Sequence, residues 1–218
     1  MFMSALWDTI FSINDKYKNA SVFLIDNHIP ALRFGTADKP IIFAGGFGAQ
    51  EWQSAPLLLK FFDTLLADME AGKTIAGIAA RKAFKRRSII IIPAVCPPKM
   101  RYEDESLVIS DLSPVAKYLA YHSAGMLVCI SGSNGHIYCA QENESLSRDA
   151  DTVGKILCAC SKLPQAQDDS GISAKFCNWT SQKALLPSFV LSPPSLEASA
   201  LEYNYKALEE TFAVCSLL

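Results

Sequence analysis

The stretch IIFAGGFGAQEW, Ile41 to Trp52, runs from an apolar segment through a glycine-rich turn to a carboxylate beside a tryptophan. This order is typical of a strand that feeds a helix, with a binding site at the junction. The following residues, 51–72, have the apolar spacing of an amphipathic helix, and Gly72 is a suitable stop. The stretch therefore predicts one strand–turn–helix unit with a site at its turn.

The rest of the chain repeats this alternation of strands and helices. Residues 1–18 and 21–35 predict a helix and two strands around a turn, in which Pro30 favours an edge position. Apolar strands are predicted at 40–47, 88–98, 125–131, 136–141 and 188–192, and helices at 111–124, 145–163 and 196–214. We expect one α/β domain over residues 1–218, with a mixed, mostly parallel sheet.

Sites in such sheets form at the carboxyl ends of the strands. The candidate positions are residues 45–51, 96–101, 131–136 and 192–195, which follow four of the predicted strands. These segments are separated in the chain but are expected to meet at one edge of the sheet.

Composition limits the partners. The 218 residues are 50% hydrophobic and carry a formal net charge of -2, which does not favour nucleic-acid binding. No apolar run is long enough to cross a membrane. The basic cluster at 81–87 is predicted to be a solvated helix end, and an anion or partner site is its alternative.

The cysteines favour a cytoplasmic location. There are seven, an odd number, and the N-terminus carries Asp8 and lacks the leading basic residues of a signal peptide. We therefore expect reduced thiols, several of them buried.

Two common sites fit the glycine-rich turn poorly. A dinucleotide loop would place a third glycine at Glu51, where a carboxylate would repel the pyrophosphate. A serine hydrolase would need a nucleophile elbow, and the nearest string, at residues 131–135, has the wrong spacing.

The segment ALRFGTADKPIIFAGGFGAQEW, residues 31–52, resembles the start of the zinc carboxypeptidase family and its bacterial amidase relatives. In that family, the strand ends in a histidine and a glutamate that both bind zinc. Glu51 and Trp52 match the pattern here, whereas Gly48 occupies the histidine position. The resemblance extends over residues 22–215 at the level of pattern and order, and it implies a three-layer sandwich.

Later segments continue the resemblance. Pro97 matches a proline of the family, and Cys96 stands in place of its asparagine. The third zinc ligand falls at Ser131, and the catalytic glutamate falls at Ser192. Arg101 is the one arginine where the family's substrate-orienting Asn-Arg pair is expected.

The resemblance implies chemistry that these residues cannot perform in the usual way. Zinc needs three protein ligands and an open position for water, and only Glu51 remains. Serine at 192 cannot act as the general base. Glu51 also has a structural interpretation, because a carboxylate is favourable in the first turn of a helix.

Two hypotheses follow. The first is a binding or regulatory pseudo-peptidase whose ligand is a small peptide or resembles an amino acid. The alternative is an active metal-dependent hydrolase of peptides or acyl-amino acids, in which Glu51, Cys96 and His136 hold zinc. His136 also fits a surface or core position, and His28 and His122 fit a turn and a helix end.

Overall fold

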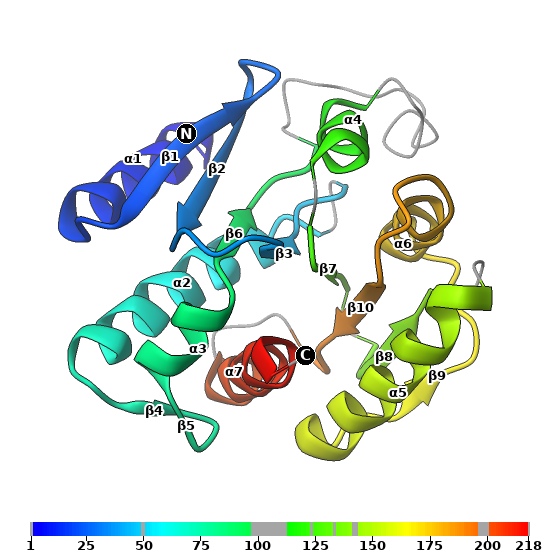
Figure 1. Ribbon diagram of the computed structural model, residues 1–218. Helices are drawn as coiled ribbons and strands as arrows, with labels where there is room; N and C mark the ends of the chain where they lie inside the picture. Colours follow the sequence, from blue (N-terminus) through cyan, green and yellow to red (C-terminus); the bar gives the residue numbers. More distant parts are fainter. Residues whose placement is uncertain are drawn as a thin grey trace.

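The structure is a computed structural model that describes residues 2–48, 51–96, 113–122, 124–132, 134–140, 144–195 and 201–217. Within these ranges a mixed sheet has the strand order β1-β2-β6-β3-β7-β10-β8-β9 (Figure 1). Its strands are β1 (Ala20–Ile25), β2 (Ile29–Phe34), β3 (Ile41–Ala44), β6 (Ile89–Ile92), β7 (Met126–Ile130), β8 (His136–Cys139), β9 (Gln165–Ala166) and β10 (Ser188–Ser192). A separate ribbon pairs β4 (Thr74–Ile75) with β5 (Ile78–Ala79).

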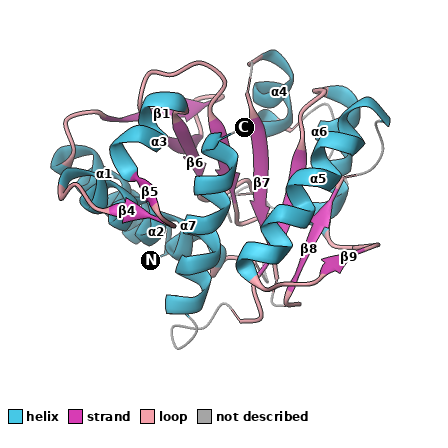
Figure 2. Ribbon diagram, turned by 60° about the horizontal axis from the view of Figure 1, so that its bottom comes forward, coloured by secondary structure: helices cyan, strands magenta, loops and turns pink. Residues whose placement is uncertain are grey.

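Helices cover both faces of the sheet, which confirms the predicted three-layer α/β sandwich (Figures 1 and 2). They are α1 (Phe2–Lys16), α2 (Ser54–Glu70), α3 (Ala80–Arg86), α4 (Pro114–Tyr121), α5 (Glu144–Ser161), α6 (Ile172–Lys183) and α7 (Leu201–Leu217). Helices α1, α2, α3, α5 and α7 contribute to one core, and α4 and α6 contribute to the other. None of the described helices is both long and apolar enough to cross a membrane.

The four central strands β6, β3, β7 and β10 run parallel to one another. Their carboxyl ends therefore lie at one edge, so the four segments predicted to meet there do meet as far as the structure describes them. Strands β1 and β2 extend the sheet as an antiparallel pair, and β8 runs antiparallel to β10.

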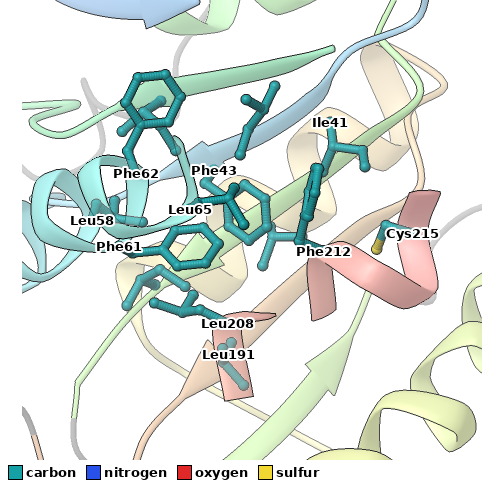
Figure 3. Packing of buried hydrophobic residues seen from close by; sticks show 14 of the residues in the cluster. Ile41, Phe43, Leu58, Phe61, Phe62, Leu65, Leu191, Leu208, Phe212 and Cys215 are labelled. Carbon is teal, nitrogen blue, oxygen red and sulfur yellow. The ribbon is translucent and has the colours of Figure 1, made fainter. Parts of the chain in front are cut away.

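Each central strand is buried on both faces, which explains its continuous apolar sequence. Side chains alternate between the two cores: Ile41 and Phe43 pack with α2 and α7, whereas Ile42 and Ala44 pack on the α4 and α6 side. Figure 3 shows the first core, in which Phe43 lies 5.4 Å from Phe61 between ring centroids.

Two local features differ from the sequence-based expectation. Helix α6 was not predicted, because its buried face includes Ser173, Thr180 and Ser181 and so lacks a strong apolar period. Pro30 does not lie on an edge strand, since β2 is paired on both sides. The pairing of β2 with β6 covers Leu32 to Phe34 only, so Pro30 lies outside that ladder, where its missing N–H is tolerated.

Candidate functional site

The glycine pair after β3 forms a tight turn against the end of β6. Gly46 has φ +63°, and a Cβ atom there would lie 2.9 Å from the Pro93 carbonyl oxygen. The N–H groups of Val95 and Cys96 donate to the carbonyl oxygens of Gly45 and Gly46, at 2.8 and 3.0 Å. Only glycine fits this left-handed, crowded position at no steric cost.

Ser54, the first residue of α2, holds this turn in place. Its Oγ accepts a hydrogen bond from the Gly46 N–H at 2.8 Å and donates to the Glu51 carbonyl oxygen at 2.6 Å. The Glu51 N–H donates to the Gly48 carbonyl oxygen at 3.0 Å, so positions 48 and 51 close a single turn. The partly buried Trp52 packs against the larger core. The turn therefore directs Glu51 toward the strand edge.

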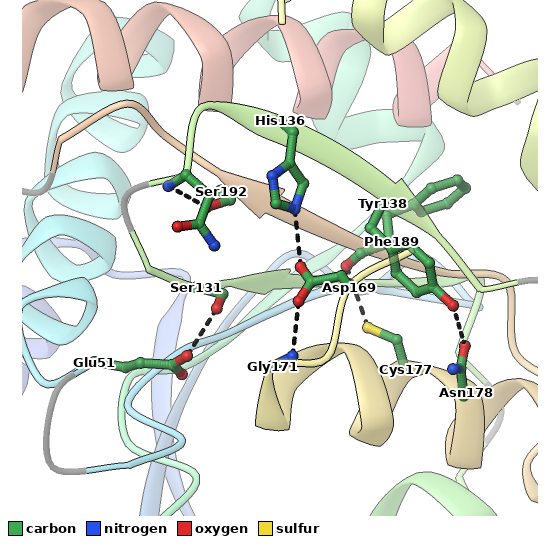
Figure 4. A network of polar contacts seen from close by, with 11 residues as sticks. Glu51, Ser131, His136, Tyr138, Asp169, Gly171, Cys177, Asn178, Phe189 and Ser192 are labelled. Carbon is green, nitrogen blue, oxygen red and sulfur yellow. Dashed lines mark hydrogen bonds and ion pairs between the residues drawn. The ribbon is translucent and has the colours of Figure 1, made fainter. Parts of the chain in front are cut away.

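Glu51 meets Ser131 at the carboxyl end of β7 (Figure 4). The Ser131 hydroxyl donates to Glu51 Oε1 at 2.7 Å. Ser131 is buried, and its N–H donates to the Leu191 carbonyl oxygen of the neighbouring strand. The structure thus brings together two positions that the family resemblance assigned to zinc ligands, and there a hydroxyl donates to the carboxylate.

Ser192, at the end of β10, is fully buried. Its Oγ accepts a hydrogen bond from the Asn134 N–H at 2.9 Å, which fixes the loop between β7 and β8 (Figure 4). It lies directly opposite His136 in the antiparallel pairing of β10 with β8. Ser192 is therefore placed at the same edge but serves as an acceptor for the backbone.

His136 interacts with Asp169, a residue that the sequence analysis did not single out. The distance from His136 Nε2 to Asp169 Oδ2 is 2.9 Å, and the two side chains are 16% and 7% exposed. Asp169 Oδ1 accepts from the Gly171 N–H at 2.8 Å, in the turn that leads into α6. The Asp-x-Gly spacing of a side-chain turn was the signal available in the sequence.

The donors that the structure describes at this edge do not fit zinc. Within the described ranges, no group of three or more His, Cys, Asp or Glu residues could hold a metal ion, so Glu51, Cys96 and His136 do not form one. Gly48 offers no side-chain donor, and Ser131 uses its proton toward Glu51. Pro97 and Arg101 lie outside the described residues.

A buried thiol lies close to Glu51. Burial raises the pKa of Cys129 well above its usual value, and the neighbouring Cys177 and the charge of Glu51 raise it further. Cys129 is therefore a neutral thiol at neutral pH in this environment.

No family model matches the chain, and no curated protein matches it. Solved structures do. Bovine thrombin-activatable fibrinolysis inhibitor, in complex with tick carboxypeptidase inhibitor, has a TM-score of 0.72 at 11% identity, with 98% of this chain and 95% of that chain covered. Carboxypeptidase A from Helicoverpa armigera has a TM-score of 0.64 at 13% identity, with 95% and 71% covered.

A metallo-carboxypeptidase from Burkholderia cenocepacia has a TM-score of 0.61 at 13% identity, with 99% of this chain and 67% of that chain covered. This chain has a zinc-carboxypeptidase-like fold. At such low identity the likeness establishes the architecture alone. The chemistry of this carboxypeptidase-like domain depends on the residues at its own strand ends.

Proposed function

We propose that this carboxypeptidase-like domain lacks conventional zinc peptidase catalysis and acts as a binding or regulatory pseudo-peptidase. Its ligand would be a small peptide or an amino-acid-like molecule. The proposed site lies at the carboxyl ends of β3, β6, β7 and β10, around Glu51, Ser131 and Ser192. A cytoplasmic location is part of the proposal, and the seven free cysteines support it.

The hydrogen bond from Ser131 to Glu51 carries this proposal. A zinc site of this kind would have two further side-chain ligands in addition to Glu51. A neutral hydroxyl is a poor zinc ligand compared with an imidazole. Here the Ser131 hydroxyl donates its proton to Glu51 Oε1 at 2.7 Å, so a hydrogen bond takes the place at which the family resemblance implies a metal ligand. Hydrogen bonds to a charged acceptor of this kind stabilise a folded protein by about 1.5–3 kcal/mol.

Ser192 supports the same conclusion. A catalytic glutamate accepts a proton from water at neutral pH, whereas a serine hydroxyl has no comparable basicity. The Ser192 oxygen is also buried and already accepts the Asn134 N–H. The proposed function therefore includes no proton transfer by Ser192.

The deciding experiment is metal content by elemental analysis after loading the protein with zinc and removing the excess. We expect substoichiometric zinc, equal in the wild type and in Glu51→Gln. One zinc per chain that Glu51→Gln removes would overturn the proposal and favour the alternative, an active metal-dependent hydrolase with relocated ligands.

Ligand binding is tested separately with a panel of dipeptides, tripeptides and acyl-amino acids. A ligand that binds the native state raises the melting temperature, and the stabilisation grows with the logarithm of its concentration once that concentration exceeds Kd. We expect at least one member of the panel to do so in the wild type and not in Ser131→Trp, which would block the strand edge. A panel without any such member would count against peptide-like ligands.

A further inference from the structure

A cavity lies at the opposite edge of the sheet from Glu51 and Ser131, where the parallel strands begin. Its volume is about 410 Å³, and its walls include Ile41, Met126 and Pro187 at the starts of β3, β7 and β10. Val153 of α5 and Cys215 of α7 complete the apolar wall. Because Gly45 to Glu51 follow the far end of β3, this cavity is separate from the site around Glu51 and Ser131.

Apart from Arg87 and Thr152, the wall of this cavity is apolar and neutral. Burial raises the pKa of the Cys215 thiol to about 12, so it remains protonated at neutral pH. Cys215, Ile41 and Phe212 belong to the same adjoining core (Figure 3). At this wall the backbone of residue 125 packs closely against residue 39. Glycine permits this approach, because a Cβ atom at position 125 would lie 2.7 Å from the Lys39 carbonyl oxygen.

Arg87 brings a positive charge to the cavity lining. Its Nη1 donates to the Lys39 carbonyl oxygen at a long 3.4 Å, and no ion pair joins it to a carboxylate of the described chain. The charge is close enough to Cys215 to oppose the rise in the pKa of that thiol. Most of the guanidinium's donors thus remain available to an incoming anion.

We infer that this cavity binds a small monocarboxylate with a short apolar body. Arg87 would pair with the carboxylate, whose planar geometry a guanidinium matches with two parallel hydrogen bonds. The apolar part would lie against Ile41, Met126 and Val153. This inference does not depend on the proposed peptide-like ligand, and it assigns a role to the last residue of the basic cluster at 81–87.

Calorimetric titration of the full chain with octanoate tests the inference, with octylamine as the probe of opposite charge. We expect saturable binding of octanoate alone, weakened at least about tenfold by Arg87→Ala, since hydrogen bonds to charged groups are worth this much. The matched control is Arg86→Ala, which removes an exposed arginine that does not line the cavity. Thr152→Trp should block the cavity, whereas Ile156→Trp, at an exposed position of the same helix, should not.

Amide shifts of the wild type upon titration give a second measurement that does not require a variant to fold. Octanoate should shift Gly125 and Val153 and leave Ser131 unchanged. Absence of saturable binding, equal binding of octylamine, or equal losses in Arg86→Ala and Arg87→Ala would each overturn the inference. So would shifts confined to the region of Glu51.

Discussion

Glu51 and Ser131 are 80 positions apart in the chain and are joined by a hydrogen bond of 2.7 Å at one edge of the sheet. The bond links the turn after β3 to the end of β7, two strands that already pair in parallel. This hydrogen bond therefore occupies the place at the edge of the sheet where the family resemblance implies a metal. The contribution of this hydrogen bond to stability can be measured, and so can metal binding at the same positions.

A double-mutant cycle measures the contact. Ser131→Ala should lower the free energy of unfolding by about 1–3 kcal/mol, because the buried carboxylate loses a donor. The same change in a Glu51→Gln background should cost less, with a coupling energy of about 0.5 kcal/mol or more. Urea unfolding of the four proteins gives these values. Ser12→Ala, at an exposed position of α1, is the control, and equal costs in both backgrounds would contradict the expected coupling.

Zinc binding should appear when the two missing imidazoles are introduced. Gly48→His combined with Ser131→His would complete a set of two histidines and Glu51, a known catalytic zinc set. Position 48 has room, since a Cβ atom there meets no other atom within 4 Å and its φ lies outside the left-handed region. Elemental analysis should find one chelatable zinc per chain in the double variant.

Controls for this prediction distinguish zinc held by the three introduced and native ligands from zinc that is bound nonspecifically. Each single variant, and the double variant carrying Glu51→Gln, should hold substoichiometric zinc. If the double variant binds no zinc, positions 48, 51 and 131 do not converge as the structure places them. If Gly48→His alone binds one zinc, the relocated-ligand alternative gains support.

The sequence predicted the layered fold well because its strongest patterns have a direct physical cause. Ile89 to Ile92 are continuously apolar because β6 is buried on both faces, and Gly72 ends α2 with φ +70°. Helix α6 escaped prediction because most of its buried residues are small or polar, with Phe176 as the one large apolar side chain among them. Apolar periodicity cannot reveal a helix of this kind.

The site was less predictable, for reasons of tertiary geometry. The pattern around Glu51 indicated which strand ends would meet, but not that Ser131 would donate to it. The contact of His136 with Asp169 depends on a loop 33 positions away, and no local pattern encodes that distance. The basic cluster at 81–87 left an anion site open as an alternative, but the cavity beside Arg87 could not be predicted, because its walls come from several distant segments.

Gly46 and Gly48 should respond very differently to alanine. Gly46→Ala would force a side chain into the left-handed region and within 2.9 Å of the Pro93 carbonyl oxygen. We expect a loss of about 1–3 kcal/mol in the free energy of unfolding. Gly48→Ala meets no atom and should change it by less than about 0.5 kcal/mol. Thermal or urea unfolding of both variants checks this, and equal effects would show that the turn differs from the one described.

Glu209 of α7 should make the domain less stable as the pH rises. Burial raises its pKa, the carboxylates of Asp68 and Glu210 raise it further, and Lys73 opposes them. The folded state therefore holds this proton more tightly than the unfolded state, whose pKa is about 4.3. The contribution to stability is fully present below that value and is lost as the pH rises through the folded pKa.

The substitution Glu209→Gln should remove this loss of stability at higher pH. Because the side chain is half-exposed and solvent screens its charge, we expect a gain of no more than about 1 kcal/mol in the free energy of unfolding near neutral pH. The gain should vanish below about pH 4, where wild-type Glu209 is protonated. Urea unfolding at both pH values measures it, with the exposed Glu70→Gln as the control. A gain that persists unchanged in acid would show that lost packing or a new hydrogen bond, and not the carboxylate charge, sets the effect.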